Sequence, residues 1–416
     1  MLIHWIWLAH RPGLNDRMKI QLLEHFRDPE DIFFADQGAF DHIEGVSEEA
    51  REALRDKNLT PAEEILEACD REKLHILTYR DAAYPVRLKN IADPPIVLYY
   101  KGQHPEFDAL PVIGVVGTRK ASAYGMQTAK RMGYQIGKCG GIVVSGMAYG
   151  IDGMAMAGAL TAGQKTVGVL GCGADIVYPL SNRALFRDVE QFGCILSEFP
   201  PGTPPAKWTF PKRNRIISGL SCGVLVVEAP EKSGALITAR QAAEQGRDLF
   251  AVPGNIDMPS FVGSNRLLRD GAIMVSCGWD VLSEYEGLYP DKIRKDAAPA
   301  RQSAYPDEVE KQEVQTPAKV AQKPKIPGPK PNLKKKLEKK AIDKERSTAY
   351  SDVNVNLPKL TGDEQAIVNC LKTGERLVDD VIAETGLTTG KLLGMLTMLE
   401  LKGVISRLPG KRISLK

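Results

Sequence analysis

Residues 112–117, VIGVVG, form a short apolar run that ends in glycine, and similar runs follow it along the chain. They are GIVVSG (141–146), TVGVLG (166–171), CILSE (194–198), GVLVVEA (223–229) and DLFAVPG (248–254). A segment of helical length separates each run from the next. Continuous apolar strands that alternate with helices are typical of a parallel sheet covered on both faces. The pattern therefore predicts a doubly wound α/β domain over 110–286.

The segments before this domain have a different pattern. Residues 1–70 carry apolar side chains at helical spacing, as in MKIQLLEHF (18–26), and Gly45 separates two short helical patterns. Modules of this kind resemble sterile-alpha-motif or helix-hairpin-helix domains. They act either as packing modules or as hairpins whose turn amides bind the DNA backbone. Residues 71–109 are rich in proline, and we expect an extended connector that adds edge structure to the sheet.

The C-terminal part divides into a linker and a small module. Residues 287–358 form a basic, Pro- and Lys-rich segment, including KPKIPGPKPNLKKKLEKK (323–340), whose composition is typical of a solvated tether. Residues 359–416 read as three helices and a hairpin, with Gly386 between the second and third helices, so a winged helix is predicted. Its third helix offers only Lys391 and Lys402 as cations, which leaves both a DNA-binding and a partner-binding role open.

The composition excludes several classes of protein. A net charge of +3 over 416 residues means that any affinity for nucleic acid must come from local clusters. The seven cysteines are scattered without a C-x-x-C pair, so neither a disulfide framework nor a zinc site is predicted. The apolar start, MLIHWIWLAHRPG, reads as a buried helix, and no run approaches the length of a membrane span. We therefore expect a cytoplasmic protein without a membrane partner.

Ligands of doubly wound sheets bind where the strands end, beside the point at which the strand order reverses. The first such exit, GTRKASAYG (117–125), should leave the amides and hydroxyls of Thr118 and Ser122 free at the start of a helix. A helix N-terminus with free amides attracts anions, and Arg119 adds a bidentate phosphate donor.

The other exits repeat this chemistry. In SGMAYGIDGMA (145–155), Asp152 either belongs to a second phosphate-facing loop or caps its own helix. The longest exit, SEFPPGTPPAKWTFPKRNR (197–215), reads as a loop in which aromatic residues precede a cluster of cations. We expect IISGLS (216–221) to turn inward as the next helix.

The residue types in these exits favour holding phosphates over breaking bonds. Glycines, hydroxyls and at least six cations are present, whereas no histidine is, and acid–base catalysis at neutral pH normally needs a histidine or a tuned carboxylate pair. Neither G-x-G-x-x-G nor a Walker loop occurs, so no nucleotide cofactor is predicted. Several phosphate subsites in a row indicate a nucleic acid strand rather than a mononucleotide.

Taken in order, GTRKASAYG, SGMAYGIDGMA, LGCGADIVYPLSNRALF, SEFPPGTPPAKWTFPKRNRIISGLS, VVEAPEKSGALITARQA and GSNRLLRDGA resemble the DNA processing protein A (DprA, or Smf) family over about 75–286. The resemblance implies a Rossmann-like domain that dimerises, binds single-stranded DNA and passes it to a RecA-type recombinase, in many members during natural transformation. It implies no catalytic residue, cofactor or metal.

The candidate DNA-binding residues combine this resemblance with the exits themselves. Phe210 is the candidate for base stacking, with Trp208 as a second. The candidates for phosphate binding are Gly117, Thr118, Arg119, Ser145, Gly146, Lys207, Lys212, Arg213, Asn214, Arg215, Ser233, Gly234 and Asn265.

Two features qualify the resemblance. The family's second motif usually ends in Ala-His, but this chain has Ala155-Met156, and a methionine cannot shuttle protons or bind a hard metal. The alternative function is a nucleotide phosphoribohydrolase, since the SGALIT turn (233–238) is similar to the one in those enzymes. They place a catalytic glutamate after that turn, where this chain has Arg240 and Gln241, and Glu244 follows one turn later.

Overall fold

The computed structural model describes residues 1–295 and, in the C-terminal part, 362–372, 374–387, 389–402, 404–408 and 412–415. The chain divides into two compact units, Met1–Pro317 and Ala318–Lys416. Most of the predicted linker, 287–358, lies outside the described residues. Its first residues pack against the sheet domain, since Ile293 is buried and the amide of Arg294 donates to the carbonyl of Cys139 at 2.8 Å. In the described ranges, no helix is both long and apolar enough to cross a membrane.

A nine-stranded sheet organises the first unit, in the order β1-β2-β6-β5-β4-β3-β7-β8-β9. From β6 to β9 every neighbouring pair is parallel, which confirms the doubly wound parallel sheet. The segment predicted as an extended connector supplies β1 and β2, which join the sheet antiparallel at its edge. The strands are β1 (His75–Thr78), β2 (Val97–Gly102), β3 (Val112–Val116), β4 (Ile142–Ser145), β5 (Thr166–Val169), β6 (Cys194–Ser197), β7 (Gly223–Val226), β8 (Asp248–Ala251) and β9 (Ile273–Met274).

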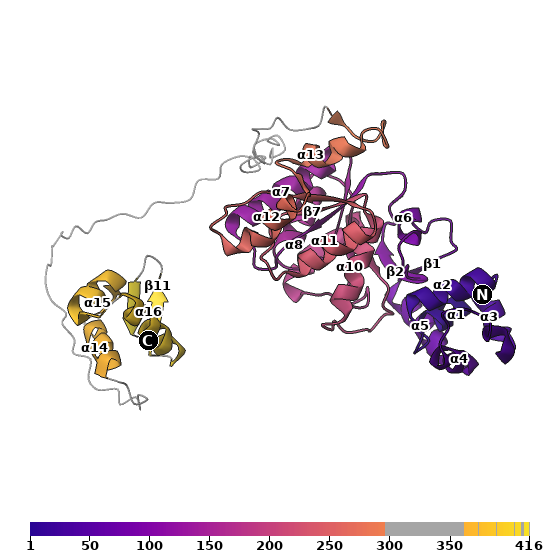
Figure 1. Cartoon of the computed structure of the whole chain (residues 1–416), viewed down its shortest axis with the longest axis horizontal. Coiled ribbons are helices and arrows are strands. Elements are labelled where there is room, and N and C mark those ends of the chain that lie inside the picture. Colours follow the sequence, from indigo (N-terminus) through magenta and orange to yellow (C-terminus); the bar gives the residue numbers. More distant parts are fainter. Residues whose placement is uncertain (296–361, 373, 388, 403, 409–411, 416) are drawn as a thin grey trace, which may run out of the picture. The chain divides into compact units, whose positions relative to one another are not determined.

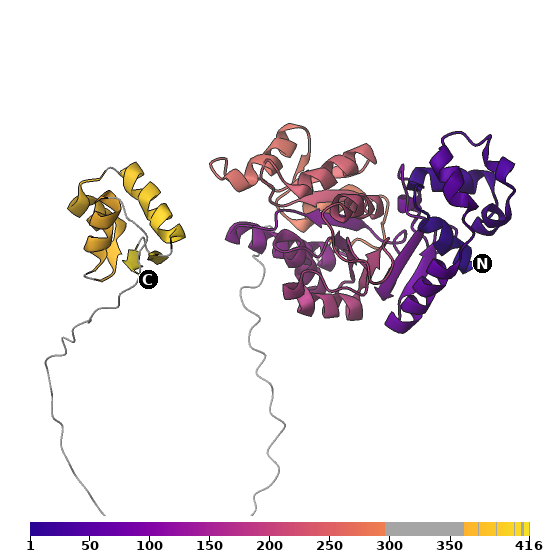
Figure 2. The same cartoon turned by 90° about the horizontal axis from the view of Figure 1, so that it is seen from below.

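Helices cover both faces of this sheet (Figures 1 and 2). Buried residues of α7, α8, α9 and α13 belong to the core on one face, and those of α6, α10 and α11 to the core on the other. The helices are α6 (Val86–Lys89), α7 (Ala123–Lys138), α8 (Ile151–Thr161), α9 (Arg183–Phe192), α10 (Thr209–Leu220), α11 (Gly234–Glu244), α12 (Val262–Arg269) and α13 (Gly278–Leu282), with short 3-10 turns at Leu180–Asn182, Pro259–Phe261 and Ser283–Tyr285.

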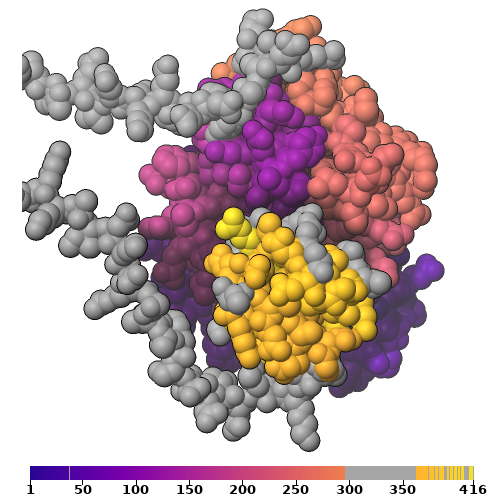
Figure 3. All heavy atoms as spheres, turned by 90° about the vertical axis from the view of Figure 1, so that its left-hand side faces the viewer, coloured from indigo at the N-terminus to yellow at the C-terminus, as the bar shows by residue number. Residues whose placement is uncertain are grey.

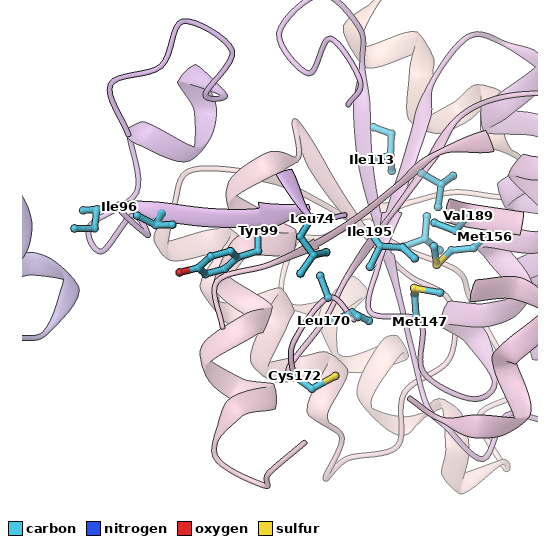
Figure 4. Packing of buried hydrophobic residues seen from close by; sticks show 14 of the residues in the cluster. Leu74, Ile96, Tyr99, Ile113, Met147, Met156, Leu170, Cys172, Val189 and Ile195 are labelled. Atoms are coloured by element: carbon cyan, nitrogen blue, oxygen red, sulfur yellow. The ribbon is translucent and has the colours of Figure 1, made fainter. Parts of the chain in front are cut away.

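Strand β3 shows how the sequence creates these two cores. Successive side chains of a strand point to opposite faces, so Ile113 and Val115 join one cluster while Val112 and Val116 join the other. All four are buried, which a strand covered on both faces requires. Figure 4 shows Ile113 among its neighbours in the first cluster.

The strand order reverses beside β3. The chain adds β4, β5 and β6 on one side of β3 and then returns to place β7 on the other side. The carboxyl ends of β3 and β7 are therefore adjacent at the switch point, where such sheets bind their ligands.

The N-terminal module is helical, as predicted, and lies beside β1 and β2 (Figures 1 and 2). Two of its helices start at side-chain caps, where Asn15 accepts from the amide of Met18 at 2.9 Å and Ser47 accepts from that of Ala50 at 3.2 Å. Trp5 and Trp7 are buried in a core that is continuous with one face of the sheet. The elements are α1 (Leu2–Ala9), α2 (Asp16–His25), α3 (Pro29–Phe34), a 3-10 turn (Gln37–Phe40), α4 (Glu48–Arg55) and α5 (Thr60–Glu72).

The second unit, yellow in Figures 1 and 3, confirms the predicted winged helix. Gly386 adopts a left-handed conformation with φ of 65° between the second and third helices, where the sequence places the turn. The strands of its sheet follow the order β10-β12-β11. The elements are α14 (Gly362–Leu371), β10 (Arg376–Leu377), α15 (Val378–Thr385), α16 (Thr389–Leu401), β11 (Ile405–Leu408) and β12 (Arg412–Leu415).

Candidate nucleic-acid interface

A cavity of about 310 Å³ lies at the switch point. It is lined by residues that follow β3, β4 and β7 and by the first turns of α10. The structure brings together eight of the predicted site residues here: Gly117, Thr118, Arg119, Phe210, Arg213, Asn214, Ser233 and Gly234. We call this the switch-point cavity.

The loop after β3 is arranged differently from the prediction. The amides of Thr118 and Ser122 are not free, because Thr118 donates to the carbonyl of Glu228 at 2.8 Å and Ser122 donates to its carboxylate at 3.1 Å. The hydroxyl of Ser122 also donates to this carboxylate, and it accepts from the amide of Gly125 at the start of α7. The buried Glu228 side chain thus occupies the position at α7 where an anion was expected.

A second carboxylate closes the loop after β4. Asp152, in the first turn of α8, is buried at the wall of the cavity and accepts from the amide of Gly146 at 3.2 Å, so it holds the strand exit in place. Burial raises the pKa of this carboxyl, and nearby Arg213 and backbone amides oppose that rise. The close packing explains Gly117, because a Cβ there would lie 2.4 Å from the side chain of Ile151.

Arg213 stabilises the ends of two strands. Its guanidinium donates to the carbonyl of Gly146 at 2.9 Å and to that of Val169, and its Nε donates to the side chain of Asn214 at 3.2 Å. Only 4% of Arg213 is exposed, and burial lowers its pKa to about 10. The side chain therefore supports the wall of the cavity. The negative charge of neighbouring Asp152 partly opposes the fall in its pKa.

Three flat side chains form a stack, of which Arg119 and Phe210 line the cavity and Tyr178 does not. The Arg119 guanidinium lies 5.1 Å from the ring centroid of Phe210, and the ring of Tyr178 stacks on Phe210 at 5.7 Å with an interplanar angle of 29°. Both Arg119 and Tyr178 are exposed, so the stack reaches solvent. Such a stack offers π faces and a delocalised cation, which are the groups that bind unpaired bases. Tyr178 was not among the predicted site residues, although an aromatic residue in a strand exit was the available signal.

Helix α11 supplies an N-terminus to the same cavity. Ser233 caps it by accepting from the amide of Ala235 at 3.3 Å, and a Cβ at Gly234 would meet open space. The first amides of a helix carry partial positive charge. Exposed Lys120 and Lys232 lie at the edge of the cavity, beside Arg119. The cavity thus gathers three exposed cations around one helix N-terminus.

The start of α10 corrects the prediction for the longest exit. Helix α10 begins at Thr209, so Phe210 and the basic residues are helical, and a helix start at residue 216 was wrong. Pro211 lies in the first turn, where a missing N–H costs no helical hydrogen bond. The proline in TFPKRN looked like a loop signal but marks a helix start.

Lys212 and Arg215 lie on another side of α10. Arg215 is 3% exposed and pairs with Glu198 at 2.5 Å, Asp16 at 3.0 Å and Asp93 at 3.3 Å. Lys212 pairs with Glu198 at 3.2 Å and Asp16 at 3.4 Å. Both cations line a separate cleft and do not line the switch-point cavity.

Four other predicted residues also lie outside the cavity lining, among them Gly146, whose amide donates to Asp152. The hydroxyl of Ser145 is buried and donates to the carbonyl of Val115 at 2.5 Å. The side-chain amide of Asn265 exchanges two hydrogen bonds of 3.1 Å with the backbone of Gly254. Lys207 is exposed in the turn before α10. These positions shape or flank the strand exits.

Sequence and structure comparisons identify the family. Residues 75–286 match the family described as DNA recombination-mediator protein A, and residues 354–411 match the DprA winged helix domain. Protein Smf of Synechocystis sp. is 33% identical over 421 residues, covering 98% of this chain and 97% of that protein. The chain belongs to the DNA recombination-mediator protein A family.

Other members of the DNA recombination-mediator protein A family agree with this assignment. DNA processing protein DprA of Bacillus subtilis is 43% identical over 220 residues, covering 53% of this chain and 74% of that protein. The X-ray structure of DNA processing protein A from Streptococcus pneumoniae has a TM-score of 0.61 and 34% identity, covering 68% of this chain and 98% of that one. The resemblance found in the sequence motifs is confirmed.

Two residues bear on the catalytic alternatives for this family member. Met156 is fully buried and packs in the core near Met147, as Figure 4 shows, so this position offers no proton relay. Glu244 lines the cleft beside Lys212, not the switch-point cavity. The geometry therefore gives no support to the phosphoribohydrolase alternative. Among the residues that the structure describes, no group of three or more His, Cys, Asp or Glu side chains could hold a metal ion.

In the winged helix, both lysines of the predicted third helix form ion pairs. Lys391 pairs with Asp363 at 2.6 Å, and Lys402 with Glu364 at 2.7 Å. A paired lysine contributes less positive potential to its surface than a free one, so these pairs reduce what the two lysines offer to DNA.

Proposed function

We propose that this family member binds single-stranded DNA at the switch-point cavity, without sequence preference, and passes it to a RecA-type recombinase. The stack formed by Arg119, Phe210 and Tyr178, beside the N-terminus of α11, is the observation that carries the proposal. Unpaired bases stack on such rings at about 1–3 kcal/mol per base, whatever their identity. Bases within a duplex already stack on one another, so the arrangement favours a single strand.

Phosphate groups are held by the cations and amides around that stack. Arg119, Lys120 and Lys232 are exposed at the cavity, and Ser233 and Gly234 start α11. We infer a role in DNA recombination, including natural transformation, that needs no cofactor and no catalytic step. This role belongs in the cytoplasm, where incoming strands and recombinase meet.

Binding should be strongly salt-dependent and selective for single strands. Three phosphate contacts, one for each exposed cation, correspond to a slope of log K against log salt of about −2. Affinity for a fluorescent oligo-dT should then fall about 20-fold between about 50 and 200 mM salt. Fluorescence anisotropy measures both quantities. Equal or tighter binding of a matched duplex, or affinity that ignores salt, would refute the proposal.

We also propose that the chain dimerises through its Rossmann-like domain. Strand β9 ends the sheet, and both of its residues are exposed, Ile273 at 39% and Met274 at 67%. An apolar edge strand is a favourable surface for pairing with a second copy.

Met274→Glu is expected to convert the dimer to a monomer, because it places a charge on this apolar edge. Sedimentation velocity at several concentrations measures the change. Phe192→Glu is the matched control, since this equally apolar residue is 54% exposed on α9, which packs on β2, β5 and β6. A monomeric wild type, or a dimer that withstands Met274→Glu, would contradict the proposed interface.

A further inference from the structure

A charged cluster connects the N-terminal module to helix α10. Asp16 and Lys19 come from α2, while Lys212 and Arg215 come from α10. Glu198 follows β6 and completes the contacts between them. The side chains of Asp16, Lys19, Glu198 and Arg215 are each exposed by 10% or less. The cluster is therefore a largely buried junction, with Lys212, 38% exposed, at the cleft beside it.

Asp16 is the residue of the N-terminal module that reaches α10. Its carboxylate lies 3.0 Å from Arg215, 3.4 Å from Lys212 and 3.1 Å from Lys19. It also lies in the first turn of α2, where the helix dipole favours a negative charge. One carboxylate thus contacts three cations, one on its own helix and two on α10. Asp16 and Arg215 are 199 residues apart in sequence.

The charges in this junction balance. Asp16, Glu198 and Asp93 face Lys19, Lys212 and Arg215, three carboxylates against three cations. Removal of one buried charge leaves its partners uncompensated, which is far more costly than loss of an exposed pair. The contacts of Glu198 with Lys212 and Arg215 both use one carboxylate oxygen, and its other oxygen is buried without a hydrogen bond.

The same helix carries the DNA-stacking ring on a different face. Lys212 and Arg215 are three residues apart and face the junction, whereas Phe210, Arg213 and Asn214 face the switch-point cavity. The rotation of α10 about its axis therefore sets both contacts at once. Loss of the junction contacts would leave this rotation fixed from the cavity side alone, where Arg213 binds the carbonyls of Gly146 and Val169.

We propose that Asp16 is a positioning residue for single-stranded DNA binding: by holding Lys212 and Arg215, the N-terminal module fixes α10 so that Phe210 faces the bound strand. The inference rests on the proposed function, because it assigns a task to the module within that function. It gives the helical module a role other than binding DNA through its own turns.

Asp16→Asn in the full chain distinguishes this positioning role from the effect of net charge on DNA binding. The variant gains one unit of positive charge, which alone would strengthen DNA binding, whereas loss of positioning weakens it. We expect an affinity for oligo-dT about five- to tenfold lower than that of Asp36→Asn, which makes the same charge change at an exposed position. An affinity equal to or above that control would overturn the proposal.

A double-mutant cycle with Phe210→Ala separates positioning from general damage. If Asp16 acts through the placement of this ring, Asp16→Asn should cost little further affinity once the ring is absent. Asp16→Glu, which keeps the charge, should restore most of the binding. Full additivity of the two substitutions would show that Asp16 does not act through Phe210.

Hydrogen exchange of α10 without DNA tests the positioning apart from the proposed function. Asp16→Asn should raise the exchange of amides in Thr209–Leu220, while Asp36→Asn should not. Unchanged exchange overturns the positioning even if DNA binds, whereas a wild type that does not bind DNA overturns the proposed function alone. Should Asp16→Asn not fold, Lys212→Met replaces it in the exchange assay, because it removes the 38%-exposed partner of Asp16 on α10.

Discussion

Arg119→Ala should lower the affinity for single-stranded DNA about 30-fold, equally for all sequences. The side chain is exposed at the cavity and stacks on Phe210, so its loss removes one phosphate donor and one face of the stack. A hydrogen bond to a charged group contributes about 2 kcal/mol, and 1.4 kcal/mol corresponds to about tenfold in affinity. Anisotropy titrations with oligo-dT and with a mixed sequence measure the loss.

Arg187→Ala is the matched control for this loss. Arg187 is exposed on α9 and carries the same charge, but it does not line the switch-point cavity. Its removal should change affinity by less than twofold at about 0.15 M salt, because exposed charges beyond the Debye length are screened. Equal losses in the two variants would mean that net charge, and not the cavity, determines binding.

The alternating apolar runs were sufficient to predict the doubly wound sheet. Each run is too uniformly apolar for a half-exposed strand, and β3 is buried on both faces as that composition requires. Two details depended on tertiary contacts instead. Strands β1 and β2 pair antiparallel at the edge, and β9 has only two residues, so neither arrangement has a clear local signal.

The sequence motifs predicted where the site lies, but they did not show which of its cations line the cavity and which pair with carboxylates elsewhere. Lys212, Arg213 and Arg215 look equivalent in KRNR, yet on a helix residues two apart point in different directions. Arg213 binds backbone carbonyls beside the cavity, while Arg215 meets Asp16 and Glu198. Because these partners are distant in sequence, only the folded chain shows which arginine is already neutralised.

The sequence predicted more open anion sites at the strand exits than the structure contains. Glu228 and Asp152 occupy two of them from within the protein, and α11 remains open to the cavity. A carboxylate that accepts backbone amides at a strand exit satisfies the same donors that a phosphate would. The sequence signal for an anion site is thus shared by internal carboxylates.

Arg215→Met should destabilise the first unit by about 3–5 kcal/mol, because it leaves Glu198 and Asp16 buried with too little positive charge. Urea denaturation followed by tryptophan fluorescence measures this unit alone, since Trp5, Trp7, Trp208 and Trp279 all belong to Met1–Pro317. Arg119→Ala, at an exposed position, should change the free energy of unfolding by no more than about 0.5 kcal/mol.

Adding Glu198→Gln to Arg215→Met distinguishes lost charge from lost packing. The amide removes the uncompensated carboxylate while keeping its shape, so the double variant should be more stable than Arg215→Met. If it is less stable by the sum of both single effects, Arg215 contributes through its contacts with the backbone of Asp93 and with its own helix rather than through its charge. Arg215 would then stabilise the fold by packing rather than as a counter-charge.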